Sequence, residues 1–273
     1  MKMFDIFKRF KKAKERCKFT LVLGGGSARG IAHIGVLKVL DKEKIPIDAI
    51  VGTSMGALIG AAYSIGIPLS RLEEKAHGFT WDKLFDLTFP KMAIVEGKKL
   101  MLAIEETLEG KGFQDVRIPL TIVTTDIEKN EEVAYTSGDL AKIVRASCSW
   151  PGIFNPVEID GRLLVDGGVK NSVPTKAAKR QGAEYIIASD VGFCVKHGKI
   201  ENIFQMLLQS FQIMGEELNH YQSIAADVVI KPMLGDIDQS AFNRSREAIR
   251  IGEHAAEEKI AEIKTRLWIH DGR

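Results

Sequence analysis

The order of strand and helix patterns near the start of the chain constrains the fold more than any other feature. The stretch "FTLVL" (19–23) has the continuous apolar character of a buried strand, and residues 31–43 follow it with apolar side chains at helical spacing. The pair then repeats, with a short strand pattern at 47–54 and a helix pattern at 55–66. Short turns between alternating strands and helices are typical of a parallel sheet with helices on its faces. The sequence therefore predicts an α/β fold.

The alternation continues after an interruption. Residues 69–112 read as helices and loops without a clear strand, and we expect them to form an insertion or a cap. The strand pattern returns at 118–128 with an expected antiparallel neighbour at 131–138, and Asp160-Gly161 marks a hairpin. Further strands are expected at 183–191 and 226–232, and helices at 201–223 and 244–267. We therefore predict one α/β domain over residues 19–273.

Residues 1–18 differ from that domain in charge. They hold eight Lys and Arg residues against two acidic ones, a net charge of +6, whereas the whole chain carries only +2. On a helical wheel one arc collects the apolar side chains Met3, Ile6, Phe7, Phe10, Ala13 and Cys17, and most of the basic ones lie elsewhere. A basic amphipathic helix can lie in a membrane interface. We therefore expect this segment either to contact a membrane peripherally or to dock on the domain.

Composition excludes several classes of protein. No apolar run approaches the ~18 residues needed to span a bilayer, and the N-terminus lacks the apolar core of a signal peptide. Cys17, Cys148 and Cys194 form neither a disulfide framework nor a metal-ligand spacing, and are expected to be reduced thiols. We therefore expect a cytoplasmic protein, at the inner face of the membrane if residues 1–18 bind there, with no nucleic-acid partner. Homo-oligomer formation stays open.

A glycine-rich loop follows the first predicted strand and opens the first predicted helix. In "GGGSARG" (24–30), consecutive glycines let backbone N–H groups converge, and such groups at a helix N-terminus favour an anion. The loop lacks the Gly-Lys-Ser/Thr ending of a P-loop, and Arg29 stands where a dinucleotide fingerprint needs its last glycine. An oxyanion hole is therefore one interpretation, with a phosphate or nucleotide site and a simple tight turn as alternatives.

The segment Gly52-Thr53-Ser54-Met55-Gly56 is a G-x-S-x-G at a predicted strand-to-helix junction, where hydrolases hold a nucleophilic serine. A serine hydroxyl needs a base. Six histidines are present, but none directly follows a late strand, where an α/β-hydrolase would place its histidine: His33, His77, His197, His220, His254 and His270. The alternative is a serine that only caps the helix.

Asp166 is the better candidate for the base, because it follows a predicted strand directly and precedes Gly167-Gly168. Partial burial beside a hydroxyl would raise the pKa of this carboxyl toward the working range of a general base. An Asp in a glycine turn is also a common structural choice, which is the alternative interpretation.

Two apolar stretches are candidate walls of a binding site. Residues 203–215 are rich in Met, Leu and Phe and suit a variable acyl surface, although a core or subunit-packing helix is the simpler interpretation. Residues 79–95 are aromatic for an insertion, and either cover the site as a lid or pack in the ordinary way.

The three motifs, in this order and each after a strand, resemble the patatin-like phospholipase family, in particular bacterial members related to the neuropathy-target-esterase branch. The stretch "ASCSWPGIFNPVEIDGRLLVDGG" (146–168) is also similar to the family's approach to its catalytic Asp. The resemblance covers roughly residues 19–235 and implies a three-layer α/β/α domain with a mainly parallel central sheet. It further implies an esterase, phospholipase or lysophospholipase that cleaves lipid esters through an acyl-enzyme, with no metal or organic cofactor.

Carried over to this chain, the resemblance implies a dyad of Ser54 as nucleophile and Asp166 as base. The amides of Gly25, Gly26 and Ser27 are expected to bind the oxyanion, and Arg29 to brace the loop or to meet an anionic group. The remaining motif glycines are Gly24, Gly30, Gly52, Gly56, Gly167 and Gly168. A non-catalytic module that binds a nucleotide, a phosphate or a lipid through the glycine loop is the alternative function. Head group, acyl length and positional preference stay open.

Overall fold

The computed structural model describes residues 17–84, 86, 92–193, 200 and 203–271. The strands are β1 (Phe19–Leu23), β2 (Ala49–Thr53), β3 (Ala93–Val95), β4 (Leu120–Asp126), β5 (Glu131–Tyr135), β6 (Gly152–Phe154), β7 (Val157–Ile159), β8 (Arg162–Asp166), β9 (Tyr185–Ser189) and β10 (Val228–Ile230). The helices are α1 (Ala32–Lys42), α2 (Met55–Ser64), α3 (Leu69–His77), α4 (Trp81–Leu84), α5 (Lys98–Leu108), α6 (Leu140–Ser147), α7 (Gly168–Asn171), α8 (Thr175–Arg180), α9 (Ile203–Ser223) and α10 (Ser245–Asp271). Single 3₁₀ turns lie at Ser27–Ile31, Phe113–Asp115 and Phe242–Arg244.

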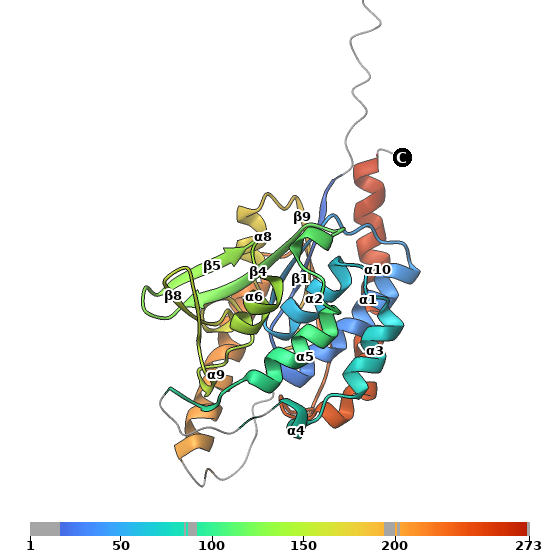
Figure 1. Cartoon of the computed structure of the whole chain (residues 1–273). Coiled ribbons are helices and arrows are strands. Elements are labelled where there is room, and N and C mark those ends of the chain that lie inside the picture. The colour runs from blue at the N-terminus through green and yellow to red at the C-terminus, as the bar shows by residue number, and fades with distance from the viewer. Residues whose placement is uncertain (1–16, 85, 87–91, 194–199, 201–202, 272–273) are drawn as a thin grey trace, which may run out of the picture.

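The central sheet has the strand order β10-β9-β1-β2-β4-β8-β7, with β5 also paired to β4 (Figure 1). Five neighbouring strands from β10 to β4 run parallel, while β5 and β8 run antiparallel to β4. The predicted α/β fold with a mainly parallel sheet is therefore confirmed. The hairpin expected around Asp160-Gly161 is the β7–β8 pair.

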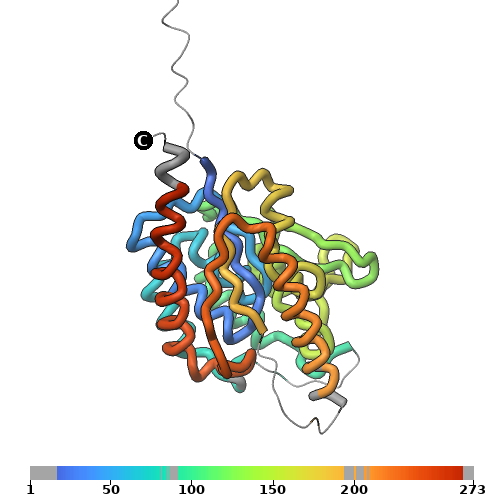
Figure 2. The backbone as a smooth tube through the Cα atoms, turned by 180° about the vertical axis from the view of Figure 1, so that it is seen from behind, coloured from blue at the N-terminus to red at the C-terminus, as the bar shows by residue number. Residues whose placement is uncertain are grey.

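Helices cover both faces of this sheet, as the alternation of side chains along β1 demonstrates. Leu21 and Leu23 point into the large core cluster shared with α1, α2, α6 and α10, whereas Val22 packs in a second cluster with Ala177 and Ala178 of α8. Successive side chains of a strand point to opposite faces, so the two clusters lie on opposite sides of the sheet. Figure 2, a view from behind, shows α9 (orange) in front of the sheet. Helix α9 therefore lies on the face of the sheet that is turned away from the viewer in Figure 1.

Two strands meet end to end along one edge of β4, and this register positions the site. β2 pairs with the first half of β4 up to the partners Thr53 and Val123. β8 arrives from the opposite direction and pairs with the second half, where Asp166 lies opposite Thr124. Since β5 overlaps both halves of β4, it occupies the other edge. The ends of β2 and β8 therefore face each other across consecutive residues of β4.

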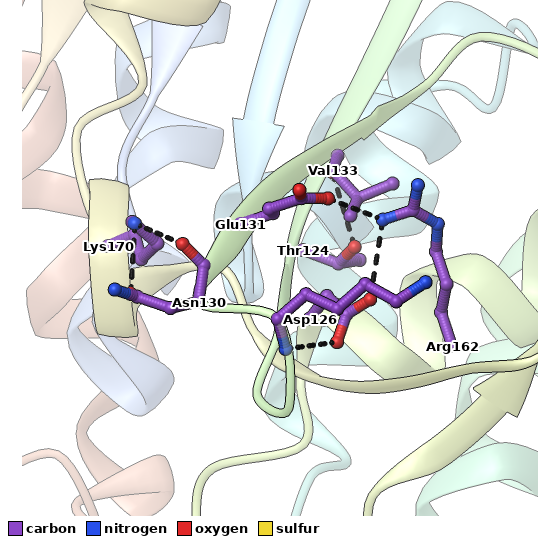
Figure 3. A network of polar contacts seen from close by, with 8 residues as sticks. Thr124, Asp126, Asn130, Glu131, Val133, Arg162 and Lys170 are labelled. Atoms are coloured by element: carbon purple, nitrogen blue, oxygen red, sulfur yellow. Dashed lines mark hydrogen bonds and ion pairs between the residues drawn. The ribbon is translucent and has the colours of Figure 1, made fainter.

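A polar network fixes β8 and α7 to the β4–β5 pair (Figure 3). Arg162 of β8 donates through Nη1 to the fully buried carboxylate of Asp126 at 3.3 Å and to Glu131 at 2.9 Å. Lys170 of α7 donates to the backbone carbonyl of Asn130 at 2.6 Å. These contacts hold both ends of the segment that carries Asp166.

The insertion contains a strand that the sequence did not indicate. β3 pairs in parallel with β6 in a separate two-stranded sheet, so the expectation of an insertion without a clear strand was wrong. Three residues are too few for an alternating pattern to be visible. The buried guanidinium of Arg145 ties this part to α6, because it donates to the carbonyls of Gly97, Glu96 and Asn155 at 3.1, 3.2 and 3.3 Å.

Residues 1–16 lie outside the described residues, and the amphipathic helix predicted there lies outside them as well. Cys17 and Lys18, the last two residues of the segment predicted to be helical, are described and are not helical. Cys17 is buried, and the backbone N–H of Lys18 donates to the Glu184 carboxylate at 3.0 Å. Neither Cys17 nor Cys148 forms a disulfide within the described residues. In the part of the chain that the structure describes, no helix combines the length and the apolar character needed to cross a membrane.

Candidate active site

Ser54 lies on a strained turn between β2 and α2. Its backbone has φ 55° and ψ −125°, a combination that non-glycine residues rarely adopt. The turn lies so close to β1 that a Cβ on Gly56 would be 2.3 Å from the carbonyl oxygen of Leu23. The Ser54 N–H donates to Ser147 Oγ at 2.8 Å, and this hydroxyl donates to the carbonyl of Val123 at 2.7 Å. The elbow is therefore fixed to both neighbouring strands.

Asp166 ends β8 directly opposite this elbow and is only 8% exposed. Its carboxylate accepts a hydrogen bond from the Gly168 N–H at 2.7 Å, and Asp166 lines the same cavity as Ser54. Burial raises the pKa of Asp166 from 3.8 to about 6, although hydrogen bonding to the Ser54 side chain and to the Gly168 N–H acts in the opposite direction. At neutral pH the group is therefore ionised, and it is a stronger base than an exposed carboxylate.

The glycine loop borders the same space, but its amides are not equivalent. The Gly25 N–H, which the resemblance assigned to the oxyanion hole, donates to the carbonyl of Ser172 at 2.9 Å. The N–H groups of Gly26 and Ser27 have no acceptor among the described residues, and both residues line the cavity that contains Ser54. Of the three loop amides assigned to the oxyanion hole, Gly26 and Ser27 therefore keep an N–H without an acceptor in the described part of the chain, whereas Gly25 does not.

Arg29 is buried behind the loop and contacts backbone oxygens. Its Nε donates to the carbonyls of Val191 and Gly192 at 3.0 and 3.2 Å, and its Nη1 to those of Gly235 and Ile237 at 3.3 and 2.6 Å. These contacts join the loop to the segments that follow β9 and β10. Of the two roles left open by the sequence, they favour bracing.

His33 is near the loop but is placed as a structural residue. It is completely buried, with Nε2 2.8 Å from the Gly24 carbonyl oxygen and Nδ1 2.9 Å from Ser189 Oγ. Since a carbonyl only accepts, Nε2 carries the hydrogen and Nδ1 accepts from the hydroxyl. Burial lowers the pKa of His33 to about 4, so the ring is neutral near pH 7. No histidine within the described side chains lines the cavity.

The remaining motif glycines permit close approach of backbone to backbone or side chain. A Cβ on Gly52 would lie 2.6 Å from the Gly56 carbonyl oxygen, and one on Gly167 only 2.4 Å from that of Val123. At Gly30 the added atom would lie 2.6 Å from the Met55 side chain. Gly24 and Gly168 border the loop and the carboxylate respectively. Residues from all three motifs line one cavity: Gly25, Gly26, Ser27, Ser54, Met55, Asp166 and Gly168.

A cavity of about 310 Å³ opens beside Ser54 and Asp166. Its walls are mainly apolar and come from the insertion, from α9 and from the approach to Asp166: Phe79, Leu84, Leu100, Ala103, Ile104, Trp150, Phe154, Phe211, Met214 and Leu218. Such a wall suits an acyl chain. Ser172 Oγ and Gln239 Nε2 also border the cavity and have no partner in the described part of the chain.

Both apolar stretches singled out in the sequence contribute to this cavity. Phe79 and Leu84 do so from the insertion, and Phe211 and Met214 from α9. The interpretation of residues 203–215 as a core helix was wrong, since several of their apolar side chains are exposed, while subunit packing stays a prediction.

Sequence reasoning missed two further residues at the site. Ser147, which holds the elbow, was not identified because a serine in the last turn of a helix carries no distinctive pattern. Cys148 follows it and lines the cavity beside Ser54. Burial raises the pKa of this thiol to about 12, so it stays protonated.

Comparison with known proteins gives a consistent result. A family model described as Patatin-like phospholipase matches residues 21–179. The chain is 37% identical over 196 residues to Patatin-like phospholipase domain-containing protein 6 of Mus musculus, which covers 68% of this chain and 14% of that protein. It is 38% identical over 182 residues to Neuropathy target esterase sws of Drosophila melanogaster, which covers 63% of this chain and 13% of that protein. The chain thus spans a small part of the length of these curated relatives.

The fold is also similar to that of VipD from Legionella pneumophila, with a TM-score of 0.60 over 91% of this chain and 67% of that one. At 12% sequence identity this likeness concerns the fold alone.

Proposed function

Because the chain belongs to the patatin-like phospholipase family, we propose that it is a serine acyl hydrolase that cleaves carboxylic esters of lipids. The observation that carries the proposal is the position of Ser54, on its strained elbow, in the same cavity lining as the buried Asp166. The apolar cavity beside them supplies room for an acyl chain. Phospholipids and lysophospholipids are the substrate classes that this combination favours.

In the acylation step, Ser54 Oγ attacks the ester carbonyl while its proton passes to the Asp166 carboxylate. The negative charge that develops on the carbonyl oxygen is bound by the N–H groups of Gly26 and Ser27, which no described residue occupies. Collapse of the tetrahedral intermediate breaks the bond to the alcohol, which leaves with the proton held by Asp166. The acyl group is then an ester of Ser54.

Deacylation repeats these steps with water. Asp166 takes a proton from the water molecule, the resulting hydroxide attacks the acyl-enzyme, and Ser54 leaves with that proton. A carboxylate with a pKa of about 6 is close enough to neutral pH to accept a proton in the transition state and still be ionised beforehand.

A fluorophosphonate probe tests the proposal directly. It should form a covalent adduct with Ser54, identified by mass spectrometry of the digested protein, and the labelled protein should lose all hydrolysis of p-nitrophenyl esters. A protein that resists the probe, hydrolyses no ester and binds nucleotides tightly would instead support the binding module.

The pH dependence of hydrolysis should report the base. Since Asp166 must be ionised, kcat/KM for a soluble ester should be constant well above pH 6 and fall about tenfold per pH unit well below it. The sign follows from the direction of the reaction: protonation removes the acceptor. His33, whose pKa is about 4, titrates too low to produce this inflection. An inflection that stays near pH 6 after Asp166→Asn, in a variant that retains activity, would exclude the assignment.

Two alanine substitutions in the loop should distinguish the Gly26 amide, which is proposed to bind the oxyanion, from the Gly25 amide, which hydrogen bonds to Ser172. A Cβ on Gly26 would lie 2.5 Å from Val191 Cγ2, so Gly26→Ala must displace the loop. A Cβ on Gly25 meets nothing closer than the Ser54 Cβ at 3.4 Å and should fit. We expect Gly26→Ala to lower kcat by about 10²–10³ with little change in KM, and Gly25→Ala to lower it far less. Steady-state kinetics decide, and equal losses in kcat would contradict the distinction.

A further inference from the structure

Helix α9 turns its polar side inward. Over residues 209–223 of α9, where the structure describes every side chain, the buried residues are Gln212, Gly215, Asn219, Gln222 and Ser223, and none of these carries a large apolar side chain. A helix on the surface of a globular domain normally buries an apolar stripe and exposes polar residues. The arrangement in this part of α9 is the reverse.

The apolar side chains of α9 lie outward on one stripe. Leu207, Phe211, Met214, Leu218 and Tyr221 follow one another at intervals of four and three residues, which places them on one side of a helix. Between 41% and 60% of each is exposed. Met206 and Ile213 lie next to this stripe and are exposed by 58% and 52%. We call these seven residues the outer face of α9.

Polar contacts hold the helix in this orientation. Asn219 Nδ2 and Ser223 Oγ donate to the buried carboxylate of Asp190 at 3.1 and 2.9 Å. The side-chain oxygen of Gln222 accepts from the Val173 N–H at 3.0 Å. Rotating α9 to bury the outer face would break these bonds and leave the buried Asp190 carboxylate with the Gly192 N–H as its one remaining donor among the described residues. The exposure of the outer face is therefore part of the fold.

The outer face is continuous with the cavity that holds Ser54. Phe211, Met214 and Leu218 belong to both, and Val169 of α7 also lines the cavity while 39% exposed. Apolar surface of this kind at the mouth of a site marks an interaction surface.

We propose that the outer face of α9 docks the protein on a lipid surface with zwitterionic head groups, so that an acyl ester enters the cavity past Phe211, Met214 and Leu218. This inference rests on the proposed function, because the continuity matters only if the cavity receives a lipid. The head-group preference follows from charge: α9 contains no Lys or Arg, and Glu216 and Glu217 are both exposed on it. An anionic surface would repel these carboxylates, whereas phosphatidylcholine would not.

The test uses the full chain carrying Ser54→Ala, so that binding does not depend on turnover. It should sediment with phosphatidylcholine vesicles at high salt, where an electrostatic contribution of the basic residues 1–18 is screened. Adding Leu207→Gln, Ile213→Gln and Tyr221→Gln should lower the vesicle partition coefficient at least tenfold. None of these three residues lines the cavity, so the same triple variant with Ser54 intact should hydrolyse a soluble ester at the wild-type rate.

The matched control is Glu216→Gln with Glu217→Gln, which makes the same kind of replacement on the same helix without removing apolar surface. Its partition onto phosphatidylcholine vesicles should be unchanged or higher. No sedimentation of the Ser54→Ala chain, or equal sedimentation of the triple variant, would overturn the proposal. So would a triple variant that changes only from dimer to monomer by light scattering, since the outer face would then pack against a second copy. Absence of soluble-ester hydrolysis by wild type would instead reject the proposed function.

A second measurement adds an apolar group rather than removing one. Tyr221→Trp places an indole at a position that is 60% exposed. Compared with the parent chain, its emission should shift to shorter wavelength when phosphatidylcholine vesicles are added. No shift would contradict docking through α9, even if the triple variant were to fold poorly.

Discussion

Replacing Ser54 with alanine or Asp166 with asparagine should each lower ester hydrolysis by at least about 10⁴ while leaving the domain folded. Ser54→Ala removes the atom that becomes acylated. Asp166→Asn retains the shape of the carboxylate but cannot accept the serine proton. The measurement is kcat/KM on a soluble ester, with circular dichroism as the check on folding. Residual activity within tenfold of wild type in either variant would refute the dyad.

Asp166→Asn should also stabilise the protein at neutral pH. Burial raises the pKa of Asp166 from 3.8 in the unfolded chain to about 6, so the folded state binds more protons between these values and stability falls as pH rises through them. Removing the charge should recover on the order of 2 kcal/mol in the free energy of unfolding above pH 6. The gain should vanish near pH 4, where the wild-type group is protonated. Urea unfolding at pH 8 and at pH 4 measures the gain in stability and its loss. A variant less stable than wild type at pH 8 would contradict the burial argument.

The histidines provide the control for the base. His77 is half-buried and hydrogen bonds to Ser245 Oγ at 2.9 Å, away from the cavity lining, so His77→Ala should retain most activity. His254 is exposed and pairs with Glu258 within α10, and its replacement should have no effect. A folded single-histidine variant that lost more than about a hundredfold in kcat would assign general-base catalysis to that histidine.

Arg29→Met should destabilise the domain strongly. The substitution removes the donors of four backbone carbonyl groups in a buried region where Arg29 is only 5% exposed. Each carbonyl left without a partner costs about 1–3 kcal/mol, although such costs do not simply add. We expect the free energy of unfolding to fall by at least about 3 kcal/mol. Denaturant unfolding measures this quantity.

Arg29→Lys is the matched variant, because it keeps the charge but cannot reproduce the planar fork of donors. It should recover only part of the lost stability. If Arg29→Met instead unfolded like wild type and raised KM for anionic lipids, the guanidinium would be a ligand for the head group, the other role that the sequence leaves open.

Much of the fold can be predicted from the sequence because it depends on local patterns of apolar and polar residues. The alternation of a buried strand with an amphipathic helix in residues 19–66 follows from which side chains must leave water. The motif glycines can be recognised for a similar reason, because a side chain does not fit at their positions. At Gly56 and Gly167 an added Cβ would lie 2.3 and 2.4 Å from backbone oxygens. Glycine motifs that allow such a close approach can be recognised in the sequence even when the approaching segment is unknown. The predictions of Ser54 on an elbow and of Asp166 at a strand end depend on this information.

Two features could not be predicted from local sequence patterns: the strand in the insertion and the orientation of α9. β3 has three residues and pairs only with β6, which lies more than fifty positions later, so no pattern within it indicates a strand. Residues 203–215 look like a core helix because they are apolar. Their orientation was decided instead by polar contacts to Asp190, which overcame the tendency of the apolar stripe to be buried.

The class of fold and the residues that carry the proposed chemistry can be predicted from local patterns in the sequence. How these residues meet depends on the assembled sheet. Ser54 and Asp166 face each other because β2 and β8 approach consecutive residues of β4 from opposite directions. The Gly25 N–H donates to the carbonyl of Ser172, and the Arg29 guanidinium donates to the carbonyl of Ile237, 208 positions away. A chain of amino acids specifies which groups can donate and accept, but partners this distant become defined only when the sheet has assembled and brought its strand ends together.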